Sequence, residues 1–182
     1  MKKTGFIIGL AVITAGLFFS WPARAQAPEP KGIEPGYSVA TDKGITLQWK
    51  VDGEMLKVKV SAPTTGWVAA GFDPSRAMKG ANIVIGYVKD GKAEIRDDFG
   101  NGLFSHKADT ELGGKDDILD KTGKEENGTT EISFTIPLNS GDEKDKPLAA
   151  GKTYKVILAA GGNDADNFTS RHKKTGEVEI KL

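Results

Sequence analysis

The sequence predicts an all-β protein, and three observations support that class. Apolar and polar residues alternate in several short runs, which is the periodicity of a half-buried strand. Two of the runs are followed by Asp-Gly, a pair typical of tight hairpin turns because it tolerates positive φ. The 182 residues contain no amphipathic helical segment of ordinary length. Short strands separated by turn signals favour a sandwich or a barrel.

The first part of the domain predicts two hairpins with a buried strand between them. The hairpin turns fall at Asp52-Gly53 and Asp90-Gly91. The run from Trp67 to Phe72 is almost wholly apolar, as in a strand that is covered on both faces. The predicted strands are residues 45–51, 56–60, 67–72, 83–88 and 93–97.

The second part predicts strands at residues 130–136, 153–160 and 177–182, with Ile132, Phe134, Ile136, Val178, Ile180 and Leu182 pointing inward. Pro137 ends the first of these because proline cannot donate to a ladder. Residues 98–128 form the longest stretch without strand character. Because long loops in compact domains are usually functional or mobile, we expect a loop of that kind here.

The N-terminus predicts export. Residues 1–25 combine a basic start, an apolar run and Ala23-Arg24-Ala25, the small-x-small pattern of a signal-peptide cleavage site. We expect a mature start at Gln26 and a periplasmic or secreted protein with no membrane span; an uncleaved N-terminal anchor is the alternative. Residues 26–36 are a proline-rich lead-in, and residues 37–182 form one domain.

Composition excludes several classes of function. The chain has no cysteine, which rules out disulfides, thiolate metal sites and haem attached through thioethers. Without residues 1–25, the 25 basic residues fall to 22 against 25 acidic ones. That net negative charge predicts binding neither to nucleic acid nor to an anionic membrane surface.

Met78 and His172 are the candidate site residues that the sequence singles out. Each lies in a polar stretch beside a predicted strand, within residues 74–82 and 168–173. A thioether and an imidazole on two loops could ligate the two faces of a haem iron. A lone methionine is more often a gap filler and a lone histidine more often a surface residue, so the residues alone leave both interpretations open.

A haem without covalent attachment also needs an apolar slot and polar groups for its propionates. Trp67 and Phe72, at the two ends of the apolar strand, are candidates for the slot. Arg171, next to His172, and Arg76, close to Met78, are candidates to face a propionate.

The order of several motifs resembles that of DOMON domains. The motifs are Gly66–Phe72, Met78–Val88, Ile95-Arg96-Asp97, Phe134–Leu138, Ala159–Gly162 and Arg171-His172. The resemblance extends from about Gly36 to Leu182 and implies an immunoglobulin-like antiparallel β-sandwich that binds haem b or a sugar. In cytochrome members of the family, a methionine and a histidine at the positions of Met78 and His172 ligate the iron.

The resemblance therefore implies an exported haem b domain that transfers single electrons to a partner, such as an exported oxidoreductase or a membrane cytochrome. Such a domain is not an enzyme by itself. Two alternatives stay open: a haem-free module for a sugar or other small ligand, and the haem subunit of a larger exported oxidoreductase. Because some relatives use lysine as the sixth ligand, Lys79 is a rival to Met78.

Other polar clusters are weaker candidates. His106 lies in a segment, residues 105–114, that a subset of the family shares; it is either a rival axial ligand or, as we favour, a surface residue. Asp116-Asp117, Asp120 and Glu125-Glu126 are expected to be solvated. Asp164-Ala165-Asp166 lacks the glycine and the distal glutamate of a calcium loop.

Overall fold

A computed structural model describes residues 34–182. The predicted signal at residues 1–25 and most of the lead-in at 26–36 lie outside the described residues. Among the residues that the structure covers, no helix is long and apolar enough to cross a membrane.

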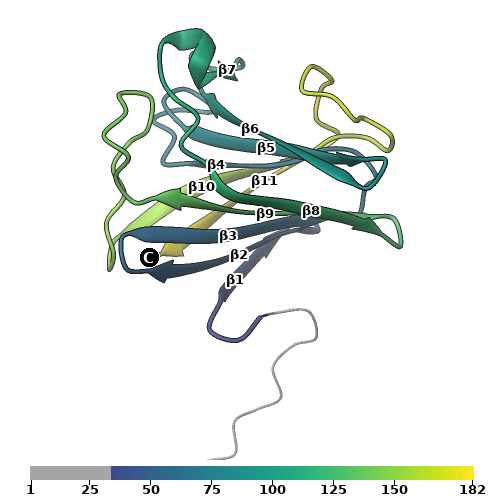
Figure 1. Cartoon of the computed structure of the whole chain (residues 1–182), viewed down its shortest axis with the longest axis horizontal. Helices are drawn as coiled ribbons and strands as arrows, with labels where there is room; N and C mark the ends of the chain where they lie inside the picture. Colours follow the sequence, from purple (N-terminus) through teal and green to yellow (C-terminus); the bar gives the residue numbers. More distant parts are fainter. Residues whose placement is uncertain (1–33) are drawn as a thin grey trace, which may run out of the picture. The chain divides into compact units, whose positions relative to one another are not determined.

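The domain is a sandwich of two antiparallel sheets (Figure 1). The five-stranded sheet has the order β1 (Ser38–Asp42), β2 (Ile45–Asp52), β3 (Met55–Ala62), β9 (Thr129–Pro137) and β8 (Leu119–Glu126). The six-stranded sheet has the order β11 (Lys174–Lys181), β10 (Thr153–Ala160), β4 (Val68–Phe72), β5 (Asn82–Lys89), β6 (Lys92–Phe99) and β7 (Lys107–Ala108). A 3-10 helix, η1 (Asp109–Leu112), follows β7. The all-β sandwich expected from the sequence is confirmed.

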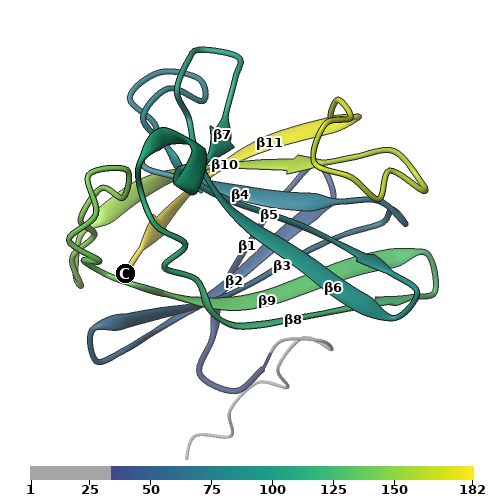
Figure 2. The ribbon, with the colours of Figure 1, turned by 45° about the horizontal axis from the view of Figure 1, so that its top comes forward.

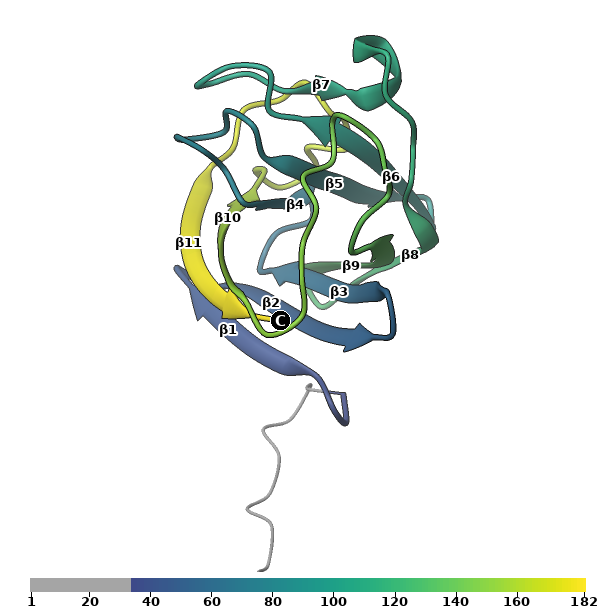
Figure 3. The ribbon, with the colours of Figure 1, turned by 90° about the vertical axis from the view of Figure 1, so that its left-hand side faces the viewer.

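The core lies between the two layers, which Figure 3 shows nearly edge-on. Each sheet contributes its inward-facing row of alternating apolar side chains. The residues predicted to point inward from β9 and β11 belong to this core or pack against it: Ile132, Phe134, Ile136, Val178, Ile180 and Leu182. Alternation was therefore a sufficient guide to which side chains face the core.

The two hairpins form as predicted, and their turns are of two different types. Asp90 and Gly91 both have positive φ, 51° and 72°, as a type I′ turn requires. In the β2–β3 hairpin, Asp52 still pairs with Met55, so Gly53 is the first of two central residues and has φ 62°. That turn matches type II′, where glycine occupies the first central position.

Three strands were absent from the sequence prediction: β1, the short β7 and β8. β1 and β8 are the edges of the five-stranded sheet, and β7 is an edge of the six-stranded sheet. Most β8 residues are exposed, and its pairing with β9 shifts register between Leu119 and Thr122. The prediction of one long loop at 98–128 is therefore wrong. A charged edge strand needs no apolar face, so it carries no alternation that could reveal it.

Candidate ligand-binding face

The six-stranded sheet has an apolar outer face, the side turned away from the five-stranded sheet. Val68, Ala70 and Phe72 of β4 point into the core, so the alternate residues Ala69 and Gly71 point outward. Gly71 lies opposite Ile157 and Ile83, and Ala69 lies opposite Ala159 and Ile85. Small residues on β4 between larger neighbours form a shallow apolar platform across three strands.

Trp67 extends this outer face at the start of β4. Its side chain clusters with Ala69 and Ile85 and is 4% exposed. A side chain on Gly161 would clash with the indole ring, so glycine is required for that close approach. The structure thus places the predicted slot residue Trp67 on the outer face.

Phe72 lies on the opposite face of the same strand. It belongs to the core between the sheets and is 1% exposed. An interval of five residues along a strand reverses the side on which a side chain points. Trp67 and Phe72 therefore do not line one slot, and the expectation that they share it does not agree with the structure.

The β10–β11 connection, residues 161–173, covers part of the outer face. Phe168 packs against Tyr87 of β5, with ring centroids 5.0 Å apart, and the Arg96 guanidinium lies 4.3 Å from the Phe168 ring centroid. The Trp67 indole N–H donates to the Ser170 hydroxyl at 2.9 Å. Surface hollows of about 250 and 290 Å³ lie instead along β8, beside Gly123 and Lys124. The face is apolar and partly covered by its own chain, and the outward-facing Ile157 and Ala159 of β10 are half-buried.

Met78 lies on the β4–β5 loop at the end of β4. The loop turns tightly between Arg76 and Lys79, where the Lys79 N–H donates to the Arg76 carbonyl at 2.9 Å. The Met78 N–H donates to the Leu103 carbonyl at 3.2 Å, which joins this loop to the one after β6. The Met78 side chain is half-buried, whereas Arg76 and Lys79 are exposed.

His172 lies at the other end of the same sheet. The next residue, Lys173, donates its N–H to the Ala160 carbonyl at 2.8 Å, and Ala160 pairs with Val68 at the start of β4. His172 and Arg171 are both exposed. Figure 2 shows the β10–β11 connection and the β4–β5 loop at opposite ends of the six-stranded sheet. The two predicted ligands therefore flank the apolar face from its two ends.

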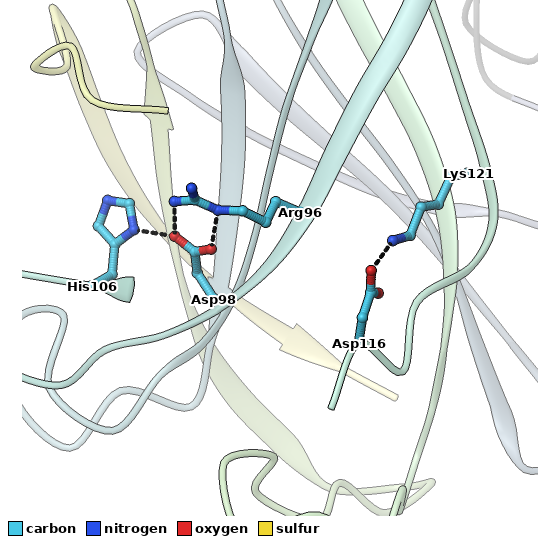
Figure 4. A network of polar contacts seen from close by, with 5 residues as sticks. All are labelled: Arg96, Asp98, His106, Asp116 and Lys121. Carbon is cyan, nitrogen blue, oxygen red and sulfur yellow. Dashed lines mark hydrogen bonds and ion pairs between the residues drawn. The ribbon is translucent and has the colours of Figure 1, made fainter. Parts of the chain in front are cut away.

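His106 belongs to a polar cluster at the edge of this face (Figure 4). Its Nδ1 lies 2.5 Å from Oδ2 of Asp98, and Arg96 donates two hydrogen bonds to the same carboxylate at 2.6 and 2.8 Å. The Asp98 side chain is fully buried, and that of His106 is 24% exposed. His106 is thus a partly exposed residue, and its imidazole is held by the buried Asp98.

Asp98 is electrostatically distinctive. Burial raises the pKa of Asp98, but hydrogen bonds from His106 and Arg96, together with their charges, outweigh burial and hold the pKa below its usual value. Sequence analysis missed Asp98 because the predicted strand ended at residue 97. Extending the β6 alternation from Arg96 would have placed Asp98 on the outer face.

Comparison with solved structures finds cytochrome domains with the same architecture. The cytochrome b domain of a pyranose dehydrogenase from Coprinopsis cinerea superposes with a TM-score of 0.55 at 12% identity, covering 79% of this chain and 80% of that one. The cytochrome domain of Myriococcum thermophilum cellobiose dehydrogenase gives a TM-score of 0.53 at 7% identity, covering 80% and 81%. At these identities the likeness establishes the fold.

Sequence comparison finds relatives of a different description. DBH-like monooxygenase protein 1 of Homo sapiens is 32% identical over 119 residues, 65% of this chain and 19% of the relative. Its Mus musculus counterpart is 35% identical over 114 residues, 62% of this chain and 18% of the relative. The chain thus spans about a fifth of the length of these relatives.

The family comparison agrees with both sets of relatives. Residues 41–161 match the DOMON domain, a range that runs from β1 through β10 and includes the Met78 loop and the His106 segment. With the sandwich, the order of its motifs and this match in agreement, the chain belongs to the DOMON domain family.

Proposed function

We propose that this chain is an exported b-type cytochrome domain that binds one haem b without covalent attachment and transfers single electrons. The observation that carries the proposal is the apolar outer face, which has Met78 on a loop at one end and His172 on a segment at the other. The fold shared with cytochrome b domains of two dehydrogenases supports it.

The residues of the outer face fit such a group. Ala69, Gly71 and Ala159 are small, the side chains of Ile83 and Ile157 pack over Gly71, and Trp67 supplies an aromatic surface beside this apolar platform. A thioether and an imidazole are both established haem ligands. Arg171 is exposed next to His172 and can pair with a propionate carboxylate.

Haem with two protein ligands supplies a one-electron carrier without an open iron position for substrate. The chain's own residues would hold the group, exclude water with Trp67 and Phe168, and leave an edge accessible to a partner. On this basis the domain is not an enzyme alone and works with a redox partner protein.

The first experiment is a visible spectrum of the purified mature protein. We expect one extractable haem per chain and, on reduction, the sharp α and β bands of a low-spin, six-coordinate centre. The reduced protein should bind carbon monoxide only slowly, because a protein ligand must leave first. A protein that stays colourless after haem titration would remove the proposal, and prompt carbon monoxide binding would indicate an open site.

Single substitutions identify the ligands. His172→Ala should abolish stable haem binding, whereas Met78→Ala should keep haem, become partly high-spin and have a lower potential, since a thioether favours the ferrous state. Lys79→Ala and His106→Ala are the matched controls and should leave the spectrum unchanged. Because the His106 Nδ1 is held by Asp98 as in many metal-binding histidines, its Nε2 is the strongest rival donor. Loss of haem in His106→Ala, but not in His172→Ala, would reassign the ligand.

A haem-free module for a sugar or other small ligand is the second candidate. The observation in its favour is that the relatives at 32% and 35% identity are described as DBH-like monooxygenases rather than as cytochromes, whereas the cytochrome domains share 12% and 7% identity with this chain. Trp67 and Phe168 would then be stacking surfaces. Saturable binding of a sugar that Trp67→Ala abolishes, in a protein that takes up no haem, would favour this candidate. A haem subunit within a larger oxidoreductase is the third.

Export is part of the proposal. Material recovered from outside the cytoplasm should begin at Gln26, as N-terminal sequencing can establish. Intact residues 1–25 in a membrane fraction would instead indicate an anchored protein.

A further inference from the structure

Three carboxylates from distant parts of the chain meet at one end of the sandwich. Asp97 lies on the inward face of β6, Asp109 begins η1, and Asp145 lies on the β9–β10 connection, residues 138–152. One carboxylate oxygen from each lies within 4.8 Å of the other two. All three residues are buried, with exposed fractions of 3%, 1% and 8%.

Most oxygens of this cluster have no hydrogen-bond partner. Both carboxylate oxygens of Asp109, Oδ1 of Asp97 and Oδ1 of Asp145 are buried without one. Oδ2 of Asp97 accepts a hydrogen bond from the Asp117 N–H at 3.1 Å. Buried polar atoms in folded proteins almost always have a partner, so several orphaned carboxylate oxygens pointing at one another require an explanation.

The charges around the three carboxylates make their burial still less favourable. Each carboxylate has further aspartates near it. Around Asp97 these are Asp145, Asp109 and Asp116, and around Asp109 they are Asp145, Asp142 and Asp98. Around Asp145 they are Asp117 and Asp142. Among the described residues, Lys144 is the one cation whose charge opposes this repulsion, and its effect on the pKa of Asp109 is smaller than those of burial and the neighbouring aspartates. Asp117 itself has a buried, unpartnered Oδ2, although the sequence analysis expected it to be solvated.

The titration of the cluster reflects the same crowding. Burial raises the pKa of Asp97 to about 8 and that of Asp109 to about 7, with neighbouring aspartates acting in the same direction. Burial also raises the pKa of Asp145 to about 6, although a hydrogen bond with Ser140 opposes this. Positive charge among the carboxylates would offset this burial and like-charge repulsion.

We propose that Asp97, Asp109 and Asp145 together bind one divalent cation, Ca²⁺. The donor set consists only of carboxylate oxygens, which hard cations prefer, and contains no sulfur or imidazole. Because Ca²⁺–oxygen bonds are about 2.4 Å long, two oxygens on opposite sides of one ion lie about 4.8 Å apart. The separations within the cluster are compatible with one shared ion of this size.

The local backbone already gathers the three segments. The Asp142 carboxylate accepts the N–H groups of Lys115 and Lys144 at 2.7 and 2.8 Å, which joins the β9–β10 connection to the chain after η1. The Gly114 N–H closes on the Asp109 carbonyl at 2.8 Å. A bound ion would fasten β6, η1 and this connection together, next to Asp98 and the outer face.

The test is Ca²⁺ binding to the purified mature protein after chelation and dialysis. Isothermal titration should give one site per chain, and added Ca²⁺ should raise the melting temperature of the chelated protein. Asp109→Asn should weaken Ca²⁺ affinity by roughly tenfold or more, because asparagine has nearly the same shape as aspartate but lacks the negative charge of the carboxylate ligand. Asp90→Asn, at an exposed hairpin turn, is the matched control and should bind Ca²⁺ like the unmodified protein.

Asp145→Asn provides a second variant should Asp109→Asn not fold, and it should show the same loss. Failure of the chelated protein to bind Ca²⁺, or Ca²⁺ binding that neither variant alters, would overturn the proposal. Tighter binding of Mg²⁺ than of Ca²⁺ would overturn the choice of ion. Running the titration on haem-loaded and haem-free protein keeps the result separate from that of the proposed function.

Discussion

At the residue scale, single backbone contacts hold the loops of the outer face. Gly100, directly after β6, shows this most clearly. Its N–H donates to the Ala81 carbonyl at 2.9 Å and its carbonyl accepts the Gly80 N–H at 2.7 Å. A side chain at position 100 would collide with the carbonyl of Met78. The position of Met78 on the β4–β5 loop therefore depends on the absence of a side chain at position 100, on the loop after β6.

Gly100→Ala should consequently destabilise the protein by about 1–3 kcal/mol, the usual cost of forcing extra volume against fixed atoms. Urea unfolding measures this directly. Gly162→Ala is the matched control, since a side chain there would meet only the flexible Lys173 side chain, at 3.3 Å or more. Equal stability of the two variants would contradict the argument. If Met78 ligates haem, Gly100→Ala should also become partly high-spin.

Prediction from the sequence located Met78 and His172 in loops beside strands, because polar neighbours mark such loops. It put Trp67 and Phe72 in one slot, whereas they lie on opposite faces of the six-stranded sheet. An apolar run covered on both faces carries no alternation to show which side each residue takes. The carboxylate cluster was invisible because its members are far apart in the chain and burial of an aspartate leaves no sequence signature.

At the element scale, β9 is the strand that links the edge strand β8 to the rest of the five-stranded sheet. It pairs with β3 on one side and β8 on the other, and Phe134 at its middle is 1% exposed. Its alternation and the terminal Pro137 made it predictable. β8, which it supports, was not, because its pairing depends on β9 rather than on any pattern of its own.

Phe134→Ala should therefore cost about 3–5 kcal/mol of unfolding free energy, the range for removing a buried aromatic ring. Phe104→Ala provides the control, because that side chain is 84% exposed and its loss should change stability by less than about 0.5 kcal/mol. Chemical denaturation of both variants tests the pair. A large loss in Phe104→Ala would mean that this ring packs against something in solution.

At the scale of the whole molecule, stability should depend on pH in an unusual direction when divalent cations are removed. Asp97, Asp109 and Asp145 have raised pKa values, about 8, 7 and 6. Carboxyls whose pKa is raised by folding contribute fully to stability below their pKa in the unfolded state, about 4. This contribution is lost as the pH rises through their pKa values in the folded state. Asp98 acts oppositely, but its lowered pKa confines its effect to more acidic solutions.

Chelated protein should thus lose roughly 1–3 kcal/mol of stability between pH 5 and pH 8, as expected when one or two protons are retained only in the folded state. Thermal unfolding across that range in a chelator measures it. Saturating Ca²⁺ should flatten the profile, and Asp97→Asn should reduce its slope even without the ion. A profile that stays flat over this range would show that the three carboxyls ionise normally.

The segment that closes the outer face has a kinetic consequence. Residues 161–173 cover part of the apolar platform, with Phe168 resting on Tyr87 and Arg96, so a planar molecule that binds beneath this segment must wait for the segment to move. Its observed uptake rate would then level off as its concentration increases, since the frequency of opening, rather than of collision, becomes limiting. While the segment stays in place, Trp67 and Ile85 are shielded from water. Newly folded molecules therefore expose less apolar surface through which they could associate.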